Sequence, residues 1–226
     1  MDTSLQYTKI SYKNFLAKVF KWMFGGLLLT TITSILFLVL GVNRISEINF
    51  FTIALVTSII EITMVILVGK RISNLSMKTA KRYFYVYSII NGITISFLLS
   101  LVDPYISILA FALTCSLFGL LYIIATYSSY DFSSIGKTCL STLPILFIAY
   151  LILFFIQAPI LFYIIILIDL FVFIGITLYD IQQIEVLYNK ASHETIETFA
   201  MIGALTLYMD FIDIFIDILI IISDGL

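Results

Sequence analysis

Seven apolar runs of spanning length constrain this chain more than any other feature of its sequence. They cover Trp22–Val42, Phe50–Val68, Tyr83–Leu101, Ile106–Tyr127, Thr138–Ile156, Ile160–Tyr179 and Ala200–Ile222. Each is close to the roughly 20 residues that a helix needs to cross the bilayer core, and hydrocarbon leaves the backbone amides no other partner than helical ones. A soluble domain of 226 residues, 62% of them apolar, would lack the polar residues to cover its surface. The sequence therefore predicts an all-α membrane protein with seven transmembrane helices.

The basic residues predict how this bundle is oriented. Eleven of the twelve lysines and arginines lie in the N-terminal segment or in the second, fourth and sixth connections, and only Arg44 lies on the other side. Because basic residues stay in the cytoplasm, we expect a cytoplasmic N-terminal segment (1–21), a transmembrane domain (22–222) and a short tail (223–226) outside the membrane. The sixth connection, Gln182–Phe199, is expected to be polar and cytoplasmic.

Acidic side chains inside the apolar runs are the candidate functional residues. An aspartate at the centre of a spanning helix costs about 2.5–3.5 kcal/mol, so it must face the bundle interior. These residues are Glu61, Asp169, Asp180, Asp210, Asp213 and Asp217. At about 100° per residue, the three aspartates of the last run share a face within about 60° of Asp210, and those of the sixth run share a face too. Single acids of this kind form interhelical hydrogen bonds. Several on two consecutive helices favour a proton site, since close carboxylates cannot both ionise easily, or a calcium site built from oxygen ligands.

The segments around two of these aspartates carry a family resemblance. They read LYDIQ at 178–182 and ALTLYMDFI at 204–212, and further similar segments are Trp22-Met23, Arg71-Ile72 and Asp131-Phe132-Ser133. Over residues 15–222 the chain resembles the Bax inhibitor-1 family, also called the transmembrane Bax inhibitor motif family. The resemblance implies six helices around a central seventh. It also implies a pH-sensitive calcium leak, with Asp180 and Asp210 as the pH sensor.

The resemblance implies further roles and also has limits. Arg71 is the implied latch partner of the sensor, and Glu61 is the implied acid of the ion pathway, which we extend to Asp169, Asp213 and Asp217. Asp180, Asp210 and Asp213 are the candidate calcium ligands. The family usually has asparagine at the position of Asp213 and an uncharged residue at that of Asp217, so this chain has the more acidic last helix.

Two other classes of function compete with a channel. One is an interaction protein that regulates a membrane protease or a stress or cell-death response. The other is an intramembrane aspartyl protease, which needs Gly-x-Gly before its second aspartate, where this chain has Tyr208 and Met209 before Asp210. We therefore expect no enzymatic activity.

Composition sets the expected partners and compartment. The net charge of −2 argues against nucleic acid, and Cys115 and Cys139 are expected to pack as small apolar residues. We expect no cofactor, with calcium ions, protons, the lipid bilayer and a membrane-protein partner as the interacting species. The bacterial plasma membrane is the expected location, and the endoplasmic reticulum membrane is the alternative.

Overall fold

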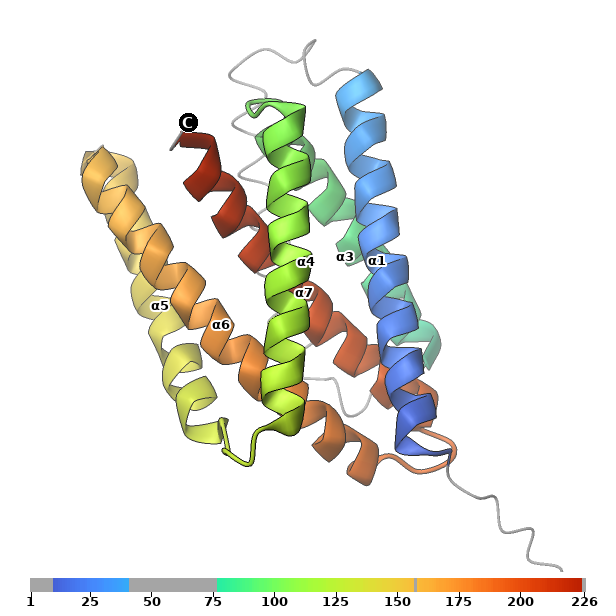
Figure 1. Ribbon diagram of the computed structural model, residues 1–226. Helices are drawn as coiled ribbons and strands as arrows, with labels where there is room; N and C mark the ends of the chain where they lie inside the picture. Colours follow the sequence, from blue (N-terminus) through green and yellow to red (C-terminus); the bar gives the residue numbers. More distant parts are fainter. Residues whose placement is uncertain (1–9, 41–76, 157, 225–226) are drawn as a thin grey trace, which may run out of the picture. The chain divides into compact units, whose positions relative to one another are not determined.

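The computed structural model describes residues 10–40, 77–156 and 158–224, and all regular structure in these ranges is α-helical (Figure 1). The helices are α1 (Tyr12–Leu40), α3 (Met77–Leu99), α4 (Pro104–Tyr127), α5 (Ser133–Ile156), α6 (Pro159–Lys190) and α7 (Ile196–Asp224). Six of the seven predicted runs coincide with these helices. The remaining run, Phe50–Val68, lies outside the described residues, so the predicted number of seven helices is not tested.

Several helices extend beyond the apolar runs that predicted them. α6 continues to Lys190, and only residues 191–195 separate it from α7. The predicted connection Gln182–Phe199 is therefore helical over most of its length. α1 likewise begins at Tyr12, ten residues before the first apolar run. Hydropathy identifies only the part of a helix that lipid can cover. Glutamine, glutamate and lysine are good helix formers, so a helix can continue through them into the polar region.

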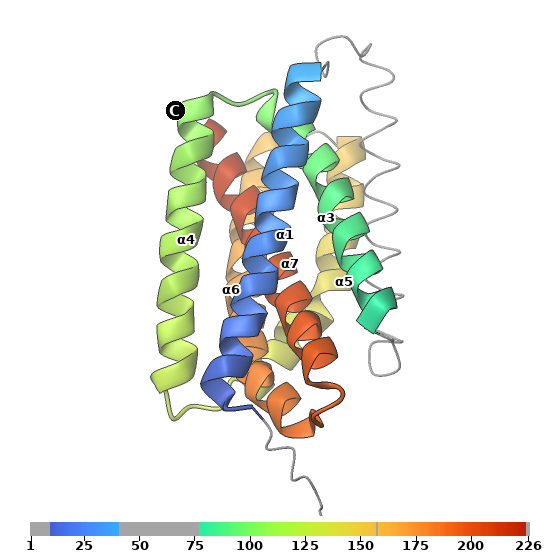
Figure 2. The same ribbon diagram turned by 90° about the vertical axis from the view of Figure 1, so that its right-hand side faces the viewer.

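Contacts divide the described chain into two compact units, and α6 and α7 each contribute residues to both. The first unit includes α1, α3 and residues 184–205, and the second includes 101–183 and 206–224. In the first unit α1 and α3 lie side by side and run parallel (Figure 2). Thr30 Oγ1 donates to the carbonyl of Ser88 at 3.0 Å, and Ser34 Oγ donates to that of Gly92 at 2.8 Å. These bonds join the two helices across their buried faces.

Within the same unit, polar and aromatic contacts join the beginning of α1 to the end of α6 and to the first turn of α7. The Tyr188 hydroxyl donates to the carbonyl of Ile10 at 2.8 Å, and its ring packs against Phe15 at 5.4 Å. Lys18 forms an ion pair with Glu197 of the first turn of α7.

The second unit is held together by two apolar contacts. One is a core between α5 and α6, made by Leu146, Leu153, Ile165, Val172 and Ile176. The other is aromatic, with Phe111 and Phe118 of α4 lying 5.7 and 5.6 Å from the ring of Phe211 on α7. These contacts join α5 to α6 and α4 to the second half of α7.

Four of the described helices are long and apolar enough to cross a membrane. They are α1, α4, α5 through Leu153, and α6. Large apolar side chains such as Ile108, Ile148 and Phe171 are exposed on α4, α5 and α6, as expected for helices in contact with lipid. α7 has four aspartates, three of them before its last turn, and it is buried along most of its length from Phe199 to Leu219. Protein rather than lipid therefore surrounds the acidic helix.

Candidate functional site

The two aspartates of the motif segments lie on α6 and α7 within the second unit. Asp180 is half-buried, and Asp210 is only 4% exposed. The carboxylate of Asp210 interacts electrostatically with those of Asp180 and Asp213. The structure thus brings Asp180 and Asp210 together across two consecutive helices.

Asp210 lacks part of the hydrogen bonding that a buried carboxylate requires. Its Oδ2 atom is inaccessible to solvent and has no hydrogen-bond partner among the described residues. Burying an ionised carboxylate without a partner is strongly unfavourable, and a second carboxylate nearby raises that cost. The pair is therefore suited to hold a proton or to interact with a cation.

Close packing of α5 on α6 fixes the position of Asp180. A Cβ atom on Gly136 would overlap the Cβ and Cγ atoms of the neighbouring Tyr179, so only glycine allows this approach. Gln182 then joins α6 to the connection between α4 and α5. Its Oε1 accepts from the backbone N–H of Phe132 at 2.9 Å, and its Nε2 donates to the carbonyl of Tyr130 at 2.9 Å. Residues on both sides of Asp180 are thus anchored.

The connection that Gln182 contacts also caps α5. Asp131 Oδ1 accepts from the backbone N–H of Ser133 at 2.9 Å. Hydrogen bonds from the hydroxyl and the backbone N–H of Ser133, with a smaller contribution from Lys137, lower the pKa of the Asp131 carboxyl from its ordinary value. This acidic group lies outside the helices and remains charged at neutral pH.

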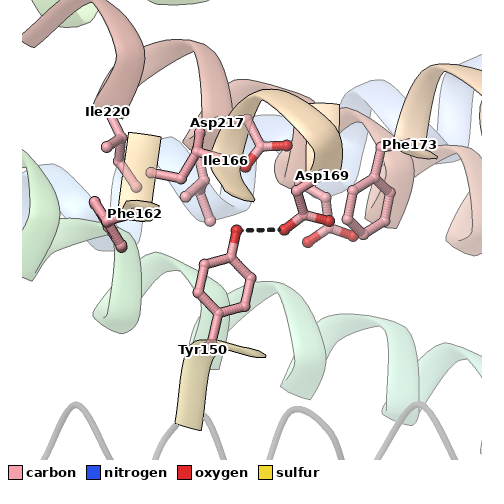
Figure 3. Close-up of a pocket in the computed structure, with 9 residues that line it drawn as sticks. Tyr150, Phe162, Ile166, Asp169, Phe173, Asp217 and Ile220 are labelled. Atoms are coloured by element: carbon pink, nitrogen blue, oxygen red, sulfur yellow. Dashed lines mark hydrogen bonds between the residues drawn. The ribbon is translucent and has the colours of Figure 1, made fainter. Parts of the chain in front are cut away.

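The other predicted aspartates gather at a separate place. Asp169, Asp213 and Asp217 line one cavity together with Tyr150, whose hydroxyl donates to Asp169 Oδ2 at 2.7 Å (Figure 3). Sequence reasoning missed Tyr150. The signal was a single tyrosine in the middle of the fifth apolar run, since a buried tyrosine hydroxyl usually needs a partner.

Some of the predicted site residues lie outside the described residues, and the predicted calcium ligands are not arranged as a metal site. Glu61 and Arg71 fall in the range 41–76, so their roles remain predictions. Among the described residues, no three acidic, histidine or cysteine side chains are arranged to hold a metal ion. The geometry therefore does not favour Asp180, Asp210 and Asp213 as a cage around a bare calcium ion.

Comparisons with known proteins agree with the resemblance of the motif segments. A family described as Bax1-I, "Inhibitor of apoptosis-promoting Bax1", matches residues 12–225. An uncharacterized protein of Deinococcus radiodurans is 30% identical over 215 residues, covering 95% of this chain and 92% of the relative. The inner membrane protein YbhL of Escherichia coli K12 is 26% identical over 226 residues, covering 96% of this chain and 94% of the relative. An uncharacterized membrane protein of Streptococcus pyogenes serotype M1 is 29% identical, and 97% of each chain is covered.

Proposed function

The chain belongs to the Bax inhibitor-1 family as an integral membrane protein, and from this premise we propose that it is a pH-sensitive calcium leak channel. The observation that carries the proposal is the Asp180–Asp210 pair, in which a nearly buried carboxylate lies beside a second carboxylate and retains an oxygen without a hydrogen-bond partner among the described residues. Such a pair changes its charge with pH, and its charge acts on two helices at once.

Gating follows from the electrostatics of the pair. When the carboxylates share one proton, α6 and α7 are held together and the path at their inner ends is closed. Loss of the proton leaves two like charges, which repel strongly in a low-dielectric environment. The helices then separate, and Arg71 stabilises one of the two charges. Each pH unit biases such an equilibrium by about 1.4 kcal/mol, which is sufficient to shift a two-state channel.

The proposal includes the architecture and the orientation of the channel. Six helices surround α7, which is supported by the burial of α7 along most of its length. The N-terminus is cytoplasmic, the C-terminus is outside, and the membrane is the bacterial plasma membrane. The names of the bacterial relatives, which include inner membrane and membrane proteins, support this location. The proposed role is ion conduction, without catalysis.

Calcium flux into proteoliposomes, measured from acid to alkaline pH, tests the proposal. We expect flux in the wild type to change with pH and the variants Asp180→Asn and Asp210→Asn to flatten that dependence, because asparagine cannot exchange a proton. Glu194→Gln is the matched control, since this acid is exposed between α6 and α7 and its loss should leave the profile unchanged.

Two results would contradict this mechanism. If both aspartate variants retain the wild-type pH profile, the pair is not the sensor. If the wild-type chain carries no calcium at any pH, the leak itself is excluded. The alternative proposal, regulation of a membrane protease or a stress response through a membrane-protein partner, then becomes the favoured one.

A further inference from the structure

A cavity of about 230 Å³ lies between α5, α6 and α7, within the second unit. Its polar lining consists of Tyr150, Asp169, Asp213 and Asp217, and the phenyl rings of Phe162 and Phe173 form part of its apolar wall (Figure 3). Three carboxylates and no basic side chain thus line this cavity, as far as the described residues define it. The cavity is distinct from the Asp180–Asp210 pair, since neither of those residues lines it.

The carboxylates around the cavity are unequally satisfied. Asp169 is 9% exposed and accepts the hydrogen bond from Tyr150. Asp217 is 5% exposed, and its Oδ2 has no hydrogen-bond partner in the part of the chain that the structure describes. The Asp217 carboxylate also interacts electrostatically with those of Asp169 and Asp213. A nearly buried carboxylate oxygen without a partner is unfavourable, and two further carboxylates line the same cavity. A positively charged occupant would stabilise this arrangement.

The size of the cavity and the spacing of its ligands indicate the kind of cation. A directly bound calcium ion needs six to eight oxygen ligands, and no three acidic side chains among the described residues are arranged to hold a metal. Six water molecules occupy about 180 Å³ at roughly 30 Å³ each, which the cavity can accommodate. Water ligands of the ion would donate hydrogen bonds to the carboxylates, so the carboxylates need not contact the ion itself.

We propose that Tyr150, Asp169, Asp213 and Asp217 form a second cation site, which binds a divalent cation together with its hydration shell. Asp217 and Asp169 accept hydrogen bonds from the ion's water ligands, and Tyr150 orients Asp169 for this contact. Asp213 interacts electrostatically with both Asp210 and Asp217, so it couples the second site to the Asp180–Asp210 pair. A cation in the cavity then offsets the negative charge of Asp213, which would otherwise repel the carboxylate of Asp210.

Binding of hexaamminecobalt(III) to the purified full-length chain tests the site. Its six ammonia ligands do not exchange, so it mimics a hydrated ion and cannot be coordinated directly by carboxylates. In calorimetric titrations of the protein in lipid nanodiscs, we expect hexaamminecobalt to bind and to compete with Mg²⁺. Asp217→Asn should weaken the binding of both cations by about tenfold or more, because a charged hydrogen-bonding group is lost. Asp169→Asn provides the second variant and should weaken them similarly.

The control and the overturning outcomes are equally specific. Asp103→Asn removes one exposed acid while keeping the cap of α4, since asparagine also caps helices, and it should bind both cations as the wild type does. The proposal is overturned if Mg²⁺ binds and hexaamminecobalt does not compete with it, because the protein then coordinates the bare ion directly. It is also overturned if methylammonium binds and neither Mg²⁺ nor hexaamminecobalt does, because the cavity then takes a monovalent organic cation. Wild-type affinity in both cavity variants also overturns it. Because the readout is binding, the outcome is independent of calcium flux and of the proposed leak.

Discussion

Asp131 lies outside the membrane-spanning helices, and the pKa of its carboxyl group is shifted by its surroundings. Its pKa is lowered by the hydrogen bonds from Ser133, so the carboxylate stabilises the start of α5 above the ordinary aspartate pKa of about 3.9. This stabilisation is lost as the pH falls through the lower pKa of the folded state. We expect the amide resonance of Ser133 to titrate with a midpoint below about 3.9 in the detergent-solubilised protein.

The matched variant for that titration is Asp131→Asn. Asparagine retains the oxygen that accepts from the Ser133 amide but does not titrate, so the resonance should no longer move in this pH range. A wild-type midpoint at or above the ordinary aspartate value would mean that the hydrogen bonds from Ser133 do not form in solution.

Residue-scale prediction from the sequence succeeded for side chains whose position is energetically unusual. An aspartate in an apolar run is costly enough to be noticed, and Asp169, Asp210 and Asp217 do lie at the interior positions that this cost demands. Tyr150 escaped notice because a tyrosine in an apolar run is less costly than an aspartate and therefore stands out less. Only the geometry reveals its hydrogen bond to Asp169.

At the scale of helices, close packing of α1 on α3 depends on the absence of one side chain. A Cβ atom at position 92 would lie 2.6 Å from Thr33 Cβ and 2.8 Å from the carbonyl oxygen of Thr30. The second contact is to backbone, which cannot rotate away. Gly92→Ala should therefore cost about 1–3 kcal/mol of stability through overpacking, partly offset by the helix propensity of alanine, worth about 1 kcal/mol.

Gly25→Ala is the control for this prediction within the same pair of helices. Gly25 is exposed on α1, and the methyl group of an alanine there would have no described atom of another residue within 4 Å, apart from its chain neighbours and its own helix backbone. Its substitution should leave stability unchanged or raise it by up to about 1 kcal/mol. Reversible unfolding in mixed detergents compares the variants, and equal stability of Gly92→Ala and the wild type would show that α1 and α3 are more loosely packed.

Helix positions were predictable from the sequence, whereas several helix ends were not. Six apolar runs located six helices because the requirement for backbone hydrogen bonding in lipid leaves no alternative. The end of α6 at Lys190 and the start of α1 at Tyr12 depend instead on local propensity and on tertiary contacts. The bond from Tyr188 to Ile10 and the ion pair of Lys18 with Glu197 are such contacts.

For the molecule as a whole, the distribution of charge predicts which side of the membrane each end occupies. Lys13, Lys18 and Lys21 lie in the first turns of α1, and Lys78, Lys81 and Arg82 lie in those of α3. The two helices run parallel and pack together, with Lys81 Nζ 5.4 Å from the ring centre of Trp22. A tryptophan at the start of an apolar run, with a lysine beside it, is typical of a membrane interface. Parallel first and third helices with basic starts are expected when the N-terminus is cytoplasmic.

Labelling of a single cysteine placed after Leu226 tests this orientation in intact cells. The native Cys115 and Cys139 are replaced by serine to remove background. If the chain crosses the membrane seven times from a cytoplasmic start, as proposed, a membrane-impermeant maleimide should label the added cysteine without permeabilisation. A cysteine placed before Asp2 is the matched probe and should react only after the cells are permeabilised. If the two probes exchange their behaviour, the basic residues face the outside. If both react only after permeabilisation, the chain crosses the membrane an even number of times, and the Asp180–Asp210 pair then belongs to a bundle with different connectivity.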